Sequence, residues 1–132
     1  MSSVVPYLSV SDAAAAIDFY VRAFDAREIL RMTGRDGRIG HAELSIGGAR
    51  IMLADEWPEG DVFSPEHYGG SAVSLVLNVP DVDSVFATAV AAGAIIERGV
   101  SDQFRGDRSG WVVDPFGHRW NVGTKTEGAD IS

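Results

Sequence analysis

The sequence predicts an α+β domain in which two βαβββ modules form curved, mixed sheets around a cleft, with one helix on the convex face of each sheet. The first observation is an order of elements that occurs twice in the 132 residues: a strand, a helix, then apolar strands separated by glycine-bearing turns. The second is that residues 10–12 and 79–81, Val-Ser-Asp and Val-Pro-Asp, begin the two helices in a similar way. Two similar modules imply two similar half-sheets, and small molecules commonly bind where such half-sheets meet.

The first module is predicted over residues 4–56 and starts with a strand at 4–10. Its helix, at 12–24, carries apolar residues at helical spacing, so that one face covers a sheet: Ala13, Ile17, Tyr20, Val21 and Phe24. Three further strands are expected, the last two joined by a tight turn at Gly47-Gly48, with the bounds 28–33, 40–46 and 49–54.

The second module is predicted over residues 72–124, and its helix at 81–92 ends at Gly93. Its strands are expected at 72–79, 94–97, 110–114 and 118–122. Residues 57–71, which carry two prolines and three glycines without a hydrophobic period, are expected to form a linker loop over the cleft. The polar residues 125–132 are expected to form a flexible tail, so the chain is one domain at 4–124.

Composition excludes several classes of function. The formal net charge of −8 argues against nucleic acid and anionic membrane surfaces as partners, because both attract basic proteins. The chain has no cysteine, which excludes disulfides, thiolate metal sites and a cysteine nucleophile. Its N-terminus lacks the basic and apolar regions of a signal peptide, and no apolar run approaches about 18 residues, so a cytoplasmic location is expected.

Several segments together resemble the vicinal oxygen chelate superfamily, which includes glyoxalase I, extradiol dioxygenases and bleomycin resistance proteins. The resemblance covers the chain from Val4 to about Thr124, and its last segment is similar to the PhnB-like branch in particular. It implies paired βαβββ modules and a homodimer. The residues that carry it are Pro6 to Asp12, Ile17 to Tyr20 with Ala23-Phe24, His41 to Leu44, and Asp114 to Trp120 after Gly106-Asp107-Arg108.

The resemblance also implies where a metal would bind in the metal-dependent members, which use His, Gln or Glu on the first and last strands of each module. The corresponding positions here are Val5, Met52, Ser74 and Asn121. Valine has no donor atom, and a methionine thioether is a soft ligand unsuited to Mg²⁺ or Mn²⁺. Neutral serine and asparagine are weak ligands, so we expect no metal and no other cofactor.

The resemblance implies that Met52 faces the cleft, and strand alternation then places a mixed set of side chains on the same face. We expect the cleft to bind a ligand through Tyr7, His41, Glu43, Met52 and Asn121, while Trp57 and Phe104 close over it from loops. Such a combination of apolar, aromatic and polar groups suits an organic molecule.

Some side chains admit two interpretations. His41 and Glu43 lie two residues apart on one strand face, as a metal pair or a general base with its partner would. A hydrogen-bonded pair that shapes the pocket is the more frequent arrangement. His118 is expected to point away from the cleft and to be structural, and Trp111 and Trp120 to cover the core under the second helix.

Three functions remain open from the sequence. The first is a metal-independent protein that binds a small molecule, such as an antibiotic or natural product that it sequesters. The alternative is a metal-dependent lyase, isomerase or dioxygenase with relocated ligands such as His41 and Glu43. The third is an interaction domain with a vestigial cleft. Whether the protein is an enzyme is therefore left undecided.

Overall fold

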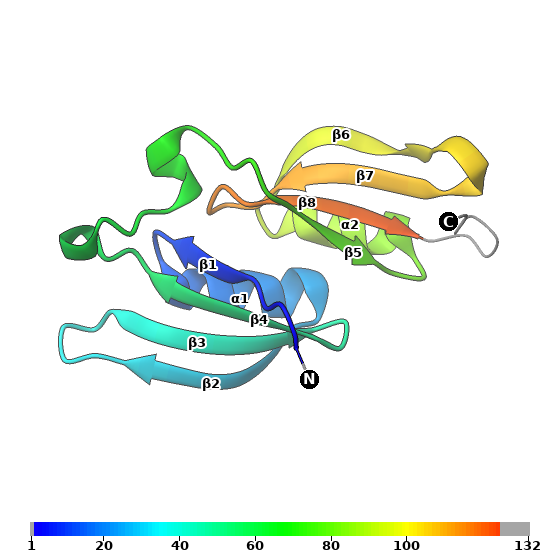
Figure 1. The fold of residues 1–132 in the computed structure, drawn as a ribbon. Coiled ribbons are helices and arrows are strands. Elements are labelled where there is room, and N and C mark those ends of the chain that lie inside the picture. The colour runs from blue at the N-terminus through cyan, green and yellow to red at the C-terminus, as the bar shows by residue number, and fades with distance from the viewer. Residues whose placement is uncertain (1, 125–132) are drawn as a thin grey trace.

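The first module contains a helix packed on a four-stranded sheet in a computed structural model that describes residues 2–124 (Figure 1). The strand order is β1-β4-β3-β2, so that the first strand lies at one edge. The bounds are β1 Tyr7–Val10, α1 Ala13–Phe24, β2 Arg27–Thr33, β3 Ile39–Ile46 and β4 Ala49–Asp55.

The second module repeats this arrangement with the order β5-β8-β7-β6. In both modules the first strand pairs in parallel with the last, and the other strand pairs are antiparallel. The predicted α+β fold with two mixed, curved sheets is therefore confirmed. The bounds are β5 Ser74–Asn78, α2 Val82–Ala91, β6 Ile95–Asp102, β7 Arg108–Val113 and β8 Arg119–Thr124.

Each helix lies against one face of its own sheet and leaves the other face uncovered by helices. Asp12 caps α1 by accepting a hydrogen bond from the Ala15 amide, and Asp81 caps α2 in the same way. Under α1, alternate residues of β3 such as Ala42 and Leu44 are fully buried. The alternation expected from the sequence is thus present, and it leaves the intervening residues for the open face.

The two modules are joined at a buried carboxylate. Asp114, 2% exposed, accepts hydrogen bonds from the hydroxyl of Tyr20 in α1 and from Nε1 of Trp120, at 2.9 Å for the indole. Nε2 of His118 donates to the Ser9 carbonyl at 3.0 Å, which ties β8 to β1. His118 is therefore structural, as predicted, although its ring bonds to the first module.

The structure differs from the sequence prediction at several strand ends and in the linker. Strand β1 begins at Tyr7 instead of residue 4, and β7 begins at Arg108 instead of residue 110. Strand β6 continues to Asp102 instead of ending near residue 97, because Ser101 and Asp102 pair with the start of β7. The linker contains short 3₁₀ helices, η1 at Pro58–Gly60 and η2 at Pro65–Tyr68, each beginning at a proline that is compatible with a first helical turn. Among residues 2–124, no helix is long and apolar enough to cross a membrane.

Candidate functional site

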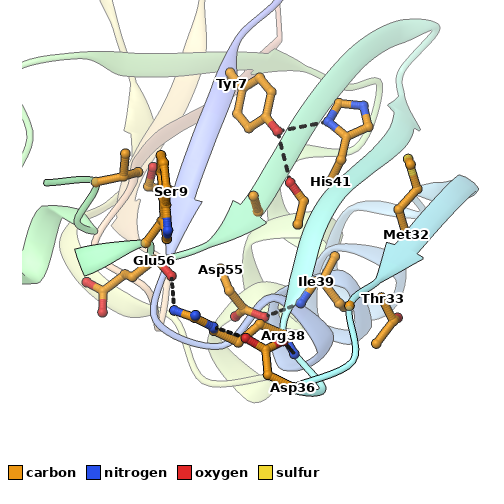
Figure 2. A pocket seen from close by; sticks show the side chains of 15 residues that line it. Tyr7, Ser9, Met32, Thr33, Asp36, Arg38, Ile39, His41, Asp55 and Glu56 are labelled. Carbon is orange, nitrogen blue, oxygen red and sulfur yellow. Dashed lines mark hydrogen bonds and ion pairs between the residues drawn. The ribbon is translucent and has the colours of Figure 1, made fainter. Parts of the chain in front are cut away.

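A cavity of about 890 Å³ opens on the uncovered side of the first sheet (Figure 2). Strands β1, β2, β3 and β4 and the start of the linker all contribute to its wall. Its volume falls in the range of about 300–1,000 Å³ that is usual for small-molecule sites. Its apolar and aromatic lining consists of Tyr7, Met32, Ile39, Ala54, Trp57 and Val62.

Tyr7 and His41 meet at one end of this cavity. The Tyr7 hydroxyl lies 2.8 Å from Nδ1 of His41, and Figure 2 shows the two side chains pointing toward one another from β1 and β3. Their rings are 5.4 Å apart at a tilt of 50°. Burial, followed by the charge of Glu43, raises the pKa of the Tyr7 phenol above its ordinary value of 10.0, so the hydroxyl keeps its proton in neutral solution.

Further polar side chains on the sheet surface continue the hydrogen-bonded series that begins with Tyr7 and His41. Nε2 of His41 lies 2.8 Å from Oε2 of Glu43, and the other oxygen of Glu43 lies 3.4 Å from Nε of Arg50. Glu43 and Met52 are register partners, and Met52 is also the partner of Tyr7. The sheet therefore places on one face four of the side chains that the sequence assigned to the cleft: Tyr7, His41, Glu43 and Met52. Of these, Tyr7 and His41 line the cavity, whereas Glu43 and Met52 do not.

Charged groups line the opposite end of the cavity, and each has a protein partner. Both oxygens of Asp55 accept backbone amides at 2.7 Å, from Ala13 and Ile39, which holds the start of α1 against β3. Asp36 and Arg38 form an ion pair at 2.8 Å. The sequence analysis assigned none of these three residues to the site, because their positions depend on how the β2–β3 turn folds over β4.

Trp57 stands at the rim of the cavity and is 56% exposed. Its backbone forms a β-bridge with Val62, and its ring packs on Gly60 so closely that a Cβ there would lie 2.3 Å from ring carbons. Glycine at residue 60 is thus required for this placement. Trp57 is held against a short turn, which limits the conformational entropy that it would lose on contacting a ligand.

The two remaining predicted residues lie in the other module. Asn121 is on the open face of β8, where it pairs with Val76 and Trp111. Phe104 lies in the turn between β6 and β7, within η3 (Phe104–Gly106), and is 83% exposed. Within one chain, neither of them lines the cavity of the first module.

The open face of the second sheet carries Arg119, whose guanidinium group is already bound by other side chains. The Arg119 guanidinium binds both oxygens of Glu97 at 2.8 and 2.6 Å and donates to the Ser74 hydroxyl at 2.7 Å. It also lies 4.5 Å from the centre of the Trp111 ring, within reach of a cation–π contact. The prediction that Trp111 covers the core is therefore wrong, whereas Trp120 is buried as expected.

Residues 3–122 match the model of the Glyoxalase/Bleomycin resistance protein/Dioxygenase superfamily. The chain belongs to this superfamily. An uncharacterized protein of Mycobacterium bovis is 49% identical over 121 residues, which cover 89% of this chain and 80% of that protein. The expectation drawn from the sequence motifs is thus confirmed at the level of the family.

Solved structures show the same fold. TioX from Micromonospora sp. ML1 is 32% identical, with a TM-score of 0.71 over 95% of this chain and 97% of that one. The fosfomycin resistance protein FosX from Listeria monocytogenes is 17% identical, with a TM-score of 0.74 over 99% of this chain and 98% of that one. At the latter identity the likeness concerns the fold alone.

Proposed function

We propose that this protein binds a small organic molecule in the cavity of its first module, and that it does so without a metal ion. The observation that carries the proposal is the cavity itself, which combines an apolar and aromatic wall with one polar pair, Tyr7 and His41. Pockets of this composition take organic molecules that present few polar groups. The carboxylates at the far end have backbone or arginine partners and need no ligand to satisfy them.

The residues at the family's metal positions support metal independence. Ser74 accepts a hydrogen bond from the Arg119 guanidinium, so a positive charge already stands where a divalent cation would be held. Val5 supplies no donor and Met52 only a thioether. These side chains do not fit a catalytic divalent metal.

A relocated metal set finds little support among the described residues. Across residues 2–124, no group of three or more His, Cys, Asp or Glu side chains is placed to hold a metal ion. His41 and Glu43 are bonded to each other and supply two donors, whereas catalytic zinc sites use three protein ligands. Binding is therefore the function that we favour over metal-dependent catalysis.

The proposed ligand class is an antibiotic or another natural product that the protein sequesters. The family description includes bleomycin resistance. This description concerns relatives and supports the proposal by analogy alone. The aromatic rim at Trp57 is suited to a flat ring system.

A thermal-shift screen of natural products, in buffer that contains a chelator, tests the proposal. A ligand that binds the folded state raises the melting temperature, by the equivalent of about 2.7 kcal/mol at one hundred times its Kd. The Ala54→Leu variant, which fills part of the cavity, should lose the shift. The matched control Ala14→Leu makes the same enlargement on the exposed side of α1 and should keep it.

Two outcomes would contradict the proposal. In the first, compounds shift the melting temperature of the wild-type protein and of Ala54→Leu equally, which would place binding outside the cavity. In the second, shifts occur only after Mn²⁺, Ni²⁺, Zn²⁺ or Fe²⁺ replaces the chelator, which would make the function metal-dependent.

We also propose that the protein is a homodimer. Val76 (63% exposed) and Ile95 (67% exposed) lie on the open face of the second sheet, where their register partners are Asn121 and Val113, and burying them against a partner would release water from apolar surface. A partner's second module could then face the open cavity of the first. Sedimentation at micromolar concentration should give twice the mass of the chain, and a single 14.1 kDa species would contradict the dimer.

A further inference from the structure

Glu43, His41 and Tyr7 form a series of hydrogen-bonded side chains, and the contacts of His41 determine which of their atoms carry a hydrogen. An ionised carboxylate can only accept hydrogen bonds, so the 2.8 Å contact with Glu43 requires a hydrogen on Nε2 of His41. In the neutral ring, Nδ1 then has a lone pair and no hydrogen. The 2.8 Å contact between Nδ1 and the Tyr7 hydroxyl must therefore use the hydrogen of the tyrosine.

This direction of donation leaves Tyr7 with its lone pairs toward the cavity. Its side chain lines the cavity and the residue is 52% exposed, so a ligand can approach the phenol oxygen. With its hydrogen engaged by His41, the oxygen can accept a hydrogen bond but has none to give. The raised pKa of Tyr7, caused by burial and the nearby Glu43, keeps the oxygen protonated and uncharged.

We propose that the hydrogen-bonded side chains of Glu43, His41 and Tyr7 make the cavity selective for aromatic molecules that carry an N–H or O–H donor, and that protonation of His41 removes this preference. The proposal rests on the proposed function, since it concerns the ligand of the same cavity. When Nδ1 gains a proton it donates to Tyr7, and the tyrosine hydrogen must turn away. Tyr7 then presents a donor to the cavity, because the alternative acceptor, the Gly40 carbonyl, is 3.5 Å distant.

The charged groups around His41 are consistent with this switch. Arg50 on β4 faces Glu43 on the side away from His41, and β2 places the apolar Met32 opposite the histidine. The other ionisable groups that line the cavity are Asp36, Arg38, Asp55 and Glu56. The three carboxylates accept hydrogen bonds from Arg38 or from backbone amides, and Arg38 also donates to the Glu56 carbonyl and to the Glu59 carboxylate. His41 is therefore the group whose protonation changes the polarity of Tyr7.

Nuclear magnetic resonance of the imidazole nitrogens tests the arrangement without any ligand. In neutral His41 of the full-length protein, we expect the hydrogen on Nε2 and the chemical shift of a bare, hydrogen-bonded nitrogen at Nδ1. In Glu43→Gln the carboxylate acceptor is lost, and both neutral tautomers should appear. A hydrogen on Nδ1 of neutral wild-type His41 would overturn the proposal.

Binding of indole and 1-methylindole tests the selectivity. The two probes share a ring system, but only indole has an N–H donor. Calorimetry with His41 in the neutral form, as shown by its nitrogen chemical shifts, should show indole binding about two- to tenfold more tightly than its methyl derivative. This ratio should fall toward one in Tyr7→Phe, and in the wild-type protein once His41 is protonated. The control Tyr68→Phe, outside the cavity, should keep the ratio.

The outcomes separate this inference from the proposed function. Equal binding of the two probes to the wild-type protein would overturn the donor preference while supporting a cavity that binds organic molecules. Preservation of the ratio in Tyr7→Phe would overturn the role of the tyrosine. Failure of both probes to bind would overturn the ligand class, whereas the proposed function would be decided by the screen with the Ala54→Leu variant.

Discussion

The bond between Tyr20 and Asp114 should be a large contributor to stability, because it joins the two modules inside the core. Tyr20 is fully buried, and burial together with Asp114 raises the pKa of its phenol well above 10.0. Asp114 also accepts hydrogen bonds from the amides of Phe116 and His118 and from the indole of Trp120, and at 2% exposure it has no contact with bulk water that would replace a lost donor. Removing the hydroxyl in Tyr20→Phe leaves a buried carboxylate oxygen with one partner fewer.

A hydrogen bond to a charged group contributes about 1.5–3 kcal/mol to the free energy of unfolding. For a domain of this length, with an unfolding entropy of about 2.1 cal/mol/K per residue, Tyr20→Phe should lower the melting temperature by about 5–10 °C. Urea unfolding and calorimetry measure the two quantities. Tyr68→Phe is the matched control, because that side chain is 67% exposed. A loss below about 0.5 kcal/mol in Tyr20→Phe would refute the reasoning.

Three further predictions concern the cavity and its rim. Trp57→Ala should weaken binding of any ligand found in the cavity, with little change in melting temperature. Phe104→Ala should change neither the binding in this cavity nor the melting temperature. Unfolding of the Trp57→Ala variant would show that the ring is structural. Asp55→Ala leaves two backbone N–H groups without an acceptor and should cost about 2–4 kcal/mol in urea unfolding, so a loss below 1 kcal/mol would contradict that role. A loop amide lowers the pKa of Glu56 below its ordinary 4.5, so its stabilising effect should be present above that pH and vanish on acidification. Stability curves of wild type and Glu56→Gln should therefore converge at low pH, and a constant difference would argue against this linkage.

The part of the site that the sequence predicted is the part that lies on strands. Alternation with period two placed His41 and Glu43 on the face opposite Leu44, and the glycine turn fixed the pairing of Glu43 with Met52. Tyr7 followed from the same rule, because β1 pairs with β4 in parallel register. Local patterns suffice here, since the pleat leaves each side chain a choice of two faces.

The sequence pattern could not place residues whose position depends on turns or on the packing of one module against the other. Arg38 enters the cavity because of the conformation of the β2–β3 turn. Trp111 lies on the open face because it pairs with Asn121, while its neighbour Val112 pairs with the buried Trp120. Asn121 and Trp57 were assigned to one cleft, but Asn121 lies on β8 and Trp57 in the linker, and they do not line a common cavity within one chain.

By itself, the sequence determined the two modules, the helices and most of the buried faces, because these follow from periodicity, capping residues and repeated order. The superfamily followed from the resemblance of its motifs to those of a known family. Tertiary structure alone decided that His41 bonds to both Tyr7 and Glu43, and that Asp114 joins the modules through Tyr20. Such contacts depend on distances of a few ångströms between segments that are far apart in the chain. A periodic pattern gives the face on which a side chain lies, whereas the fold of the whole domain determines its partner.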